Sequence, residues 1–166
     1  MKLFIFSLLF ASLFVGCIDR YDYKGCHKPI YLSYEKLRND YPEVLPPREI
    51  DKAGKIYVYG DTLLVNEKNK GIHIIDNSNK EKPIRKHFIK ILGNIDMAIK
   101  DGYLYVDSYI DLVVLDIRDI DNIVEIKEAR KEGIFPYDHD LGISKEDMDK
   151  NRCGYDENRG IVIGYK

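Results

Sequence analysis

The sequence predicts an all-β fold with about two to three four-stranded antiparallel sheets. A short apolar run that ends in Asp occurs at 71–76 and again about forty residues later at 111–116, reading Gly-Ile-His-Ile-Ile-Asp and Asp-Leu-Val-Val-Leu-Asp. The preceding runs also align, 61–66 with 102–107. Short β-type runs separated by turn residues, at a period near forty, have the spacing of four-stranded propeller blades. The pattern therefore favours a partial β-propeller, with a repeat domain over residues 55–166.

The first blade is expected over residues 55–91. Apolar runs rich in β-branched and aromatic residues alternate with turn residues such as Gly60-Asp61, a typical hairpin signal. The four strands are expected at Lys55–Tyr59, Thr62–Asn66, Gly71–Asp76 and Ile84–Ile91, the last as a polar outer-edge strand.

The second blade is expected over residues 93–127, with strands at Ile95–Ile99, Tyr103–Asp107, Asp111–Asp116 and Ile123–Lys127. In both blades the third strand is continuously apolar instead of alternating, which indicates burial on both faces. Each sheet is therefore expected to have neighbours on both sides.

The segment 17–54 is expected to be a tether and leader. Ser33 can cap a short helix over 34–39 that Pro42 ends. Several tyrosines in this segment either pack it against its own domain, which we favour, or form a ligand-stacking surface: Tyr21, Tyr23, Tyr31, Tyr34 and Tyr41.

After residue 127 the period breaks. Residues 133–153 form an acidic insertion without a β pattern, and residues 154–166 resemble part of a third blade, with a strand at 161–165. Two blades and a fraction cannot close a ring of four to eight. The favoured interpretation is that the chain is a piece of a longer propeller. The alternatives are that it closes by assembling with its own copies, or that it is an open sheet domain whose leader covers an exposed face.

The first sixteen residues have the composition of a secretory signal. Lys2 is followed by an apolar run too short for a lasting membrane span, and Gly16 precedes Cys17. This arrangement resembles the lipobox of bacterial lipoproteins, which implies cleavage before Cys17 and acylation of its thiol. Since Ile18 and not Asp follows the cysteine, the resemblance implies the outer membrane. An ordinary signal peptide or an uncleaved anchor is the alternative.

The formal charge of −2 becomes −3 when residues 1–16, which contain Lys2, are removed. The sequence has no basic patch, so it offers nothing suited to nucleic acid. Outside the cytoplasm, Cys26 and Cys153 can form a disulfide; two free thiols are the alternative.

The repeat is similar to the LVIVD repeat of bacterial extracellular β-propeller proteins. The resemblance rests on Leu63-Leu-Val65 with Ile72–Asp76 and Pro83, and on Tyr103–Val106 with Leu112–Asp116. The second copy departs from it with Asn122-Ile123 where the motif has Pro. The resemblance implies a propeller fold outside the cytoplasm and supplies no catalytic residues.

Asp76 and Asp116 occupy equivalent repeat positions, which favours a structural role as acceptors for backbone N–H groups of the following turn. The acidic insertion could hold calcium, although its spacing lacks the EF-hand order and a solvated loop is the favoured interpretation: Asp138, His139, Asp140, Glu146, Asp147 and Asp149.

No nucleophile elbow, phosphate loop, dinucleotide fingerprint or metal-type His or Cys spacing occurs in the sequence, so no catalytic residue, metal or cofactor is assigned. Two classes of function remain. The favoured one is a lipid-anchored binding or scaffold module that engages an envelope protein or glycan. The alternative is an envelope hydrolase or lyase with a site built from propeller loops.

Overall fold

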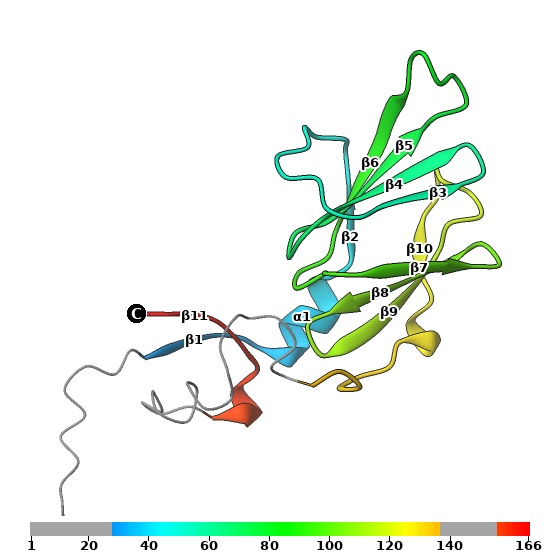
Figure 1. Ribbon diagram of the computed structural model, residues 1–166. Helices are drawn as coiled ribbons and strands as arrows, with labels where there is room; N and C mark the ends of the chain where they lie inside the picture. Colours follow the sequence, from blue (N-terminus) through cyan, green and yellow to red (C-terminus); the bar gives the residue numbers. More distant parts are fainter. Residues whose placement is uncertain (1–27, 137–155) are drawn as a thin grey trace, which may run out of the picture.

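Two antiparallel sheets stacked face to face dominate the computed structural model, which describes residues 28–136 and 156–166 (Figure 1). The first sheet has the strand order β2-β6-β5-β4-β3 and the second the order β10-β9-β8-β7. The first consists of β2 (Glu43–Leu45), β3 (Ile56–Tyr59), β4 (Thr62–Glu67), β5 (Gly71–Asp76) and β6 (Ile84–Lys90). The second consists of β7 (Met97–Lys100), β8 (Tyr103–Ser108), β9 (Asp111–Asp116) and β10 (Val124–Glu125).

The prediction of an all-β fold with antiparallel sheets is confirmed. Strands are present in all eight places where the repeat predicted them, paired in sequence order within each sheet. The last of them is shorter than expected: β10 ends at Glu125 because the backbone turns into a 3-10 helix, η1 (Lys127–Ala129), whose Ala129 N–H donates to the Ile126 carbonyl.

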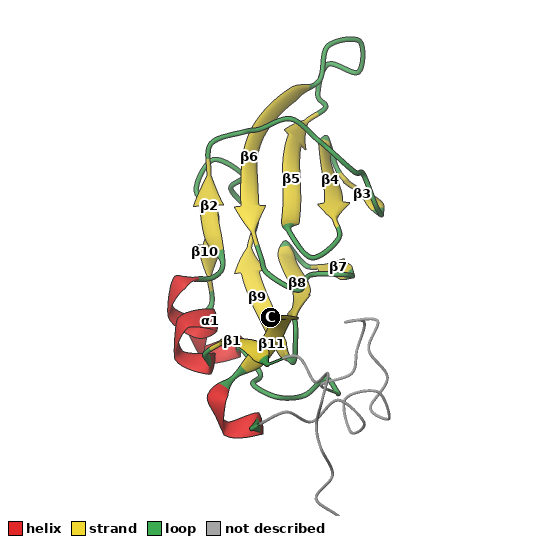
Figure 2. Ribbon diagram, turned by 90° about the vertical axis from the view of Figure 1, so that its left-hand side faces the viewer, coloured by secondary structure: helices red, strands yellow, loops and turns green. Residues whose placement is uncertain are grey.

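The leader is more ordered than a tether. Ser33 caps α1 (Tyr34–Asp40) by accepting from the Lys36 N–H at 3.2 Å, as predicted. The strand after the helix, β2, then pairs with β6 through Val44 and Ile89. The prediction that 84–91 is the outermost strand was therefore wrong, because the leader contributes one more strand to the same sheet (Figure 2).

The end of the chain also differs from the prediction of a third-blade strand. Strand β11 (Ile161–Tyr165), which follows the 3-10 helix η2 (Glu157–Arg159), pairs with β1 (Pro29–Leu32) of the leader in a separate two-stranded sheet. Ile161, Leu32 and Leu37 of α1 form a small core with partly buried tyrosines, Tyr34 and Tyr41 among them. The packing of these two tyrosines agrees with the favoured interpretation of the leader.

The two large sheets pack through non-equivalent faces. On the first sheet, the residues in the shared core include Leu64, Ile72 and Ile74, with Tyr57 packed against them. Their repeat equivalents in the second sheet are Ala98, Tyr105, Leu112 and Val114, which point away from the core because they alternate with its members along their strands.

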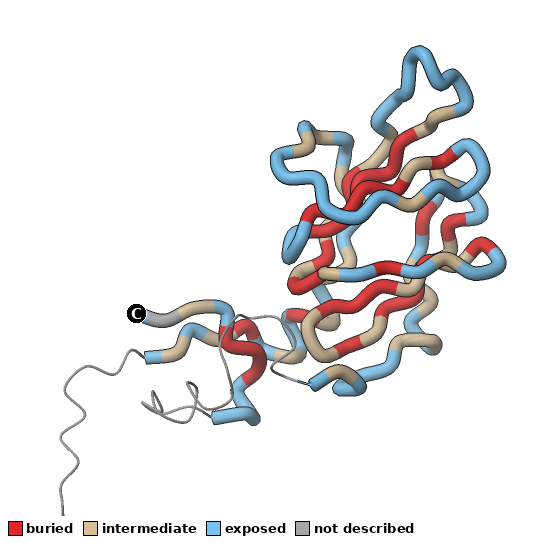
Figure 3. Tube along the Cα trace, viewed as in Figure 1, coloured by how far each residue is buried: buried red, intermediate tan, exposed pale blue. Residues whose placement is uncertain are grey.

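The second sheet contributes its other face to the core. Met97, Leu104, Val106, Val113 and Leu115 lie in the core, with Ile99 packed against it. Their equivalents on the first sheet are Ile56, Leu63, Val65, His73 and Ile75, with Val58 matching Ile99, and these point away from the second sheet. The sheets are therefore stacked head to tail, with the front of one on the back of the next. Figure 3 shows buried stretches along the strands of both sheets.

The turns after the third strands repeat in hydrogen-bond detail. Asn79 Oδ1 accepts from the Glu81 N–H at 3.1 Å, and the equivalent Asp119 Oδ1 accepts from the Asp121 N–H at 3.0 Å. The residues that begin these turns, Asn77 and Ile117, both donate to carbonyls at the start of β4 and β8. The repeat therefore extends from sequence to local geometry.

Candidate functional site

Several residues singled out in the sequence lie outside the described part of the structure. They are the lipidation candidate Cys17, the two cysteines Cys26 and Cys153, and the acidic insertion 138–149. Their lipidation, disulfide and calcium roles remain predictions from sequence alone.

Asp76 and Asp116, the two repeat aspartates, lie at the ends of β5 and β9. Asp76 Oδ1 accepts from the Ser78 N–H at 2.9 Å, and Asp116 Oδ1 accepts from the Arg118 N–H at 3.1 Å. These N–H groups lower the pKa of both carboxyls; at Asp116 the side chain of Arg118 has the larger effect. Both aspartates are therefore placed as turn acceptors.

A buried ion-pair cluster that the sequence did not predict lies on the outer face of the first sheet. Glu67 and His73 are each 1 % exposed, and His73 Nε2 lies 2.7 Å from Glu67 Oε2. Arg48 Nη2 donates to the same oxygen at 2.5 Å, while Lys70 Nζ donates to Oε1 at 3.1 Å. His73 occupies the position that is equivalent to Val113 in the second sheet. A polar residue at a position that is apolar in the other repeat was the one sequence signal that His73 has a buried polar partner.

The charge of Glu67 is stabilised despite its burial. Burial by itself would raise the pKa of its carboxyl. Hydrogen bonds from His73, Lys70 and the Lys52 N–H, together with the charge of Arg48, lower the pKa to about 2. Since Arg48 and Lys52 belong to the leader, this carboxylate holds residues 46–54, hereafter the strap, on the outer face of the first sheet.

The strap forms one wall of an open groove of about 830 Å³. The groove runs between the strap and the turn that joins β5 to β6, and Ile75 of β5 lines it. Several charged side chains of the groove are already paired. Arg85 donates two hydrogen bonds to Glu49, at 2.7 and 2.5 Å, and Arg48 binds Glu67. The arrangement thus fastens the strap to the sheet.

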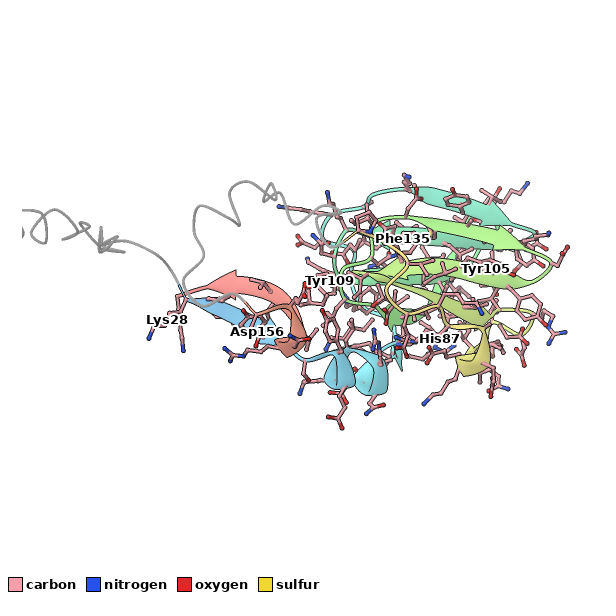
Figure 4. The ribbon with its side chains drawn as sticks, turned by 90° about the horizontal axis from the view of Figure 1, so that it is seen from below. Lys28, His87, Tyr105, Tyr109, Phe135 and Asp156 are labelled. Carbon is pink, nitrogen blue, oxygen red and sulfur yellow. The ribbon has the colours of Figure 1, made fainter. Side chains whose placement is uncertain are left out.

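A second concavity, hereafter the hollow, lies on the outward face of the second sheet and around its edge strand β7. Its volume is about 370 Å³. Figure 4, seen from the side of this sheet, labels two of its aromatic residues, Tyr105 and Phe135. The full lining is Tyr57, Asp96, Met97, Ala98, Tyr105, Asp107, Leu112 and Phe135.

The two carboxylates of the hollow are occupied by neighbouring groups. Asp107 Oδ1 accepts at 2.9 Å from the N–H groups of Ile95 and Asp96 and from the Asn94 side chain. Asp96 pairs with Lys55 of the first sheet, and this hydrogen bond lowers the pKa of Asp96, against the raising effect of burial. The hollow therefore presents mainly aromatic and apolar surface, beside two carboxylates that already accept hydrogen bonds.

The hollow is the candidate functional site because of its place in the repeat. Ala98, Tyr105 and Leu112 are the equivalents of Tyr57, Leu64 and Ile72, through which the first sheet contacts the second. Among the described residues, a surface that packs on a neighbouring sheet at one level of the repeat is thus only partly covered at the next. The face that carries the groove has a counterpart of the same kind, since Ile75 matches Leu115 of the core, but the strap already lies over it.

Among the described residues, no group of three or more His, Cys, Asp or Glu side chains has a metal-binding arrangement. No helix within residues 28–136 and 156–166 is long and apolar enough to cross a membrane.

Comparison of the chain with protein-family models, curated proteins and solved structures finds no match in any of the three.

Proposed function

We propose that the chain is a lipid-anchored module of the bacterial cell envelope that binds or scaffolds other molecules through sheets of the β-propeller type. The observation that carries this proposal is the head-to-tail stacking of two repeat-equivalent sheets. Propeller blades stack in this manner, each covering one face of the next. The similarity to LVIVD repeats and the period near forty residues support the same assignment.

The cellular location of the proposed module is inferred from the N-terminal sequence. The signal-like run and the lipobox-like Gly16-Cys17 support acylation of Cys17, and the residue after the cysteine supports the outer membrane. Lasting attachment of a lipoprotein requires more than one acyl chain, since one chain gives only marginal membrane affinity.

The hollow supplies the proposed binding surface. Tyr105 offers a ring face and Leu112 an apolar contact beside Phe135, and both carboxylates of the lining accept hydrogen bonds. Aromatic surface beside polar groups suits the contact area of a protein partner and the apolar face of a sugar ring.

The anchoring part of the proposal is tested by acyl labelling in the producing cell. Wild-type chain should incorporate labelled fatty acid and sediment with the outer membrane, whereas Cys17→Ser should do neither. Wild-type chain that stays unlabelled and soluble would overturn the lipoprotein assignment.

The binding part is tested by pull-down from envelope extract with chain lacking the lipid. Tyr105→Ala should reduce recovery of a bound envelope protein or glycan at least several-fold, while Tyr59→Ala on the exposed edge of the first sheet should not. Equal recovery with both variants would show that the hollow is not the binding surface.

A further inference from the structure

The first sheet has an open apolar edge at the face that points away from the second sheet. Ile56 and Val58 of β3 are 60 % and 69 % exposed. Their repeat equivalents, Met97 and Ile99, pack into the core between the sheets. Two side chains of interface type are therefore exposed on one end of the stack.

The other end of the stack carries the matching surface. Ala98 and Tyr105 in the hollow correspond to Tyr57 and Leu64, which receive the second sheet within the chain. The two ends thus expose part of each half of an interface that the chain already forms internally: Ile56 and Val58 at one end, and Ala98 with Tyr105 at the other.

We propose that a second copy of this chain stacks its β3 face on the hollow, so that the head-to-tail order of sheets continues from copy to copy. This inference deepens the scaffolding function proposed above and rests on it. The contact is heterologous: the surface used on one copy differs from the surface used on its neighbour.

The charges at the sheet edge are consistent with this contact. Within the chain, Lys55 at the start of β3 pairs with Asp96 before β7, and both side chains are about half exposed. In the repeat, Lys55 and Asp96 are equivalent positions of opposite sign. Stacking a second copy would place its Lys55 beside Asp96 of the first, which continues an alternating row of charges.

The strap leaves the proposed surface accessible. Arg48 of the strap lies over the Phe88 ring at 3.9 Å, and Phe88 pairs with His73 in the middle of the sheet. Ile56 lies on the same row at the opposite edge and remains exposed. Val65 of β4, like His73 and Phe88, is at most 4 % exposed, so among the described residues the exposed apolar part of this face is the β3 edge with Ile56 and Val58.

Anchoring in one membrane would favour this contact. Copies confined to the same leaflet have a high effective concentration, so a contact that is weak in solution can be populated at the surface.

Cross-linking between two differently tagged copies tests the proposal directly. Both copies carry Cys17→Ser, Cys26→Ser and Cys153→Ser; one also carries Val58→Cys and the other Ala98→Cys. Both new positions are exposed, so the substitutions should leave the fold unchanged. A short bifunctional maleimide should join the two tags. Moving the first cysteine to Ile84, which is 55 % exposed, should reduce the yield about tenfold or more.

A charge exchange provides a second, independent readout. Lys55→Asp together with Asp96→Lys preserves the ion pair within each chain. Exchanged copies should associate with one another as wild type does, but mixed pairs should associate about tenfold more weakly, because each mixed contact places like charges together.

The outcomes separate this inference from the proposed function. A single monomeric species in sedimentation up to millimolar concentration, or association without the Val58–Ala98 product, would overturn copy-to-copy stacking. If acyl labelling of Cys17 succeeds in the same protein, the envelope module survives that result. If the copies stack but Cys17 is not acylated, the stacking inference survives and the lipoprotein assignment fails.

Discussion

At the scale of single residues, the buried polar groups of this protein serve mainly to connect segments. Glu67 joins the strap to the first sheet, and Asp107 fixes the backbone that enters β7. Asn66 of the first sheet donates to Asn94, which in turn donates to Asp107, so a buried amide links the two sheets. Buried polar groups that are fully bonded specify one arrangement of their surroundings.

The stability contributed by Glu67 should depend on acid pH. Its carboxyl has a pKa of about 2 in the folded protein against an ordinary 4.5, so the unfolded chain takes up a proton first as the pH falls. The stabilisation, about 3 kcal/mol, is therefore complete above pH 4.5 and is lost towards pH 2.

Urea unfolding of wild type and Glu67→Gln between pH 2 and pH 6 checks this expectation. The difference in unfolding free energy should be largest at pH 6 and shrink towards pH 2. Glu128→Gln, on an exposed turn, serves as the control. A difference that stays constant with pH would contradict the assigned pKa.

Asp76 and Asp116 should act through their acceptor oxygens more than through their charge. Replacing either by Ala removes the acceptor for the next turn and should lower the melting temperature, whereas Asn keeps the oxygen and should restore most of it. Thermal unfolding by circular dichroism measures both. If Asn and Ala are equally harmful, the charge is the important property.

At the scale of elements, one carboxylate ties the leader helix to the second sheet. Asp111 at the start of β9 is fully buried and accepts from Arg38 of α1 at 2.9 and 3.2 Å. Arg130, which is 7 % exposed, reaches the same carboxylate at 3.4 Å and also donates to the Tyr41 carbonyl. The helix, β9 and the segment after η1 are therefore held at one point.

Asp111→Ala should be destabilising, because it removes the buried acceptor shared by Arg38 and Arg130. Leaving a buried charge unpaired costs about 3 to 5 kcal/mol, and the loss should lie at the lower end because Arg130 keeps Glu125 at 2.8 Å. Chemical denaturation measures the loss, and hydrogen exchange should show α1 opening more easily. Asp40→Ala, at the exposed end of the same helix, should cost less than about 1 kcal/mol.

The turn into β5 depends on glycine. Gly71 has φ of +143°, and a Cβ added there would collide with the Ile89 carbonyl oxygen of β6. Gly71→Ala should therefore separate β5 from β6 and cost more than Gly60→Ala, where φ is also positive but no atom lies within 4 Å. Equal melting temperatures for the two variants would refute the steric argument.

At the scale of the whole molecule, the sequence was most informative where the repeat operates. The period and the turn residues located the strands of both sheets, because strand alternation and turn chemistry are local properties. The continuous apolar run of β5 correctly indicated burial on both faces, whereas in β9 Leu112 is only partly buried and lines the hollow.

Features formed between distant segments could not be predicted in this way. The pairing of β1 with β11 and the addition of β2 to the first sheet depend on segments that lack the repeat. Likewise, the burial of Glu67 could not be predicted, since nothing local indicates that Arg48 and His73 surround it. The hollow could not be predicted either, because it depends on which face of each sheet stays uncovered in the folded chain.

The central claim is that the two sheets stack head to tail, and methyl NOE spectroscopy tests it most directly. Methyl groups of Leu64 and Ile74 should give cross-peaks to those of Val113 and Leu115. Val58, on the opposite face, should give none to the second sheet of its own chain when labelled protein is diluted with unlabelled protein. Cross-peaks from Val65 and Ile75 to the core of the second sheet, in place of those from Leu64 and Ile74, would contradict the account.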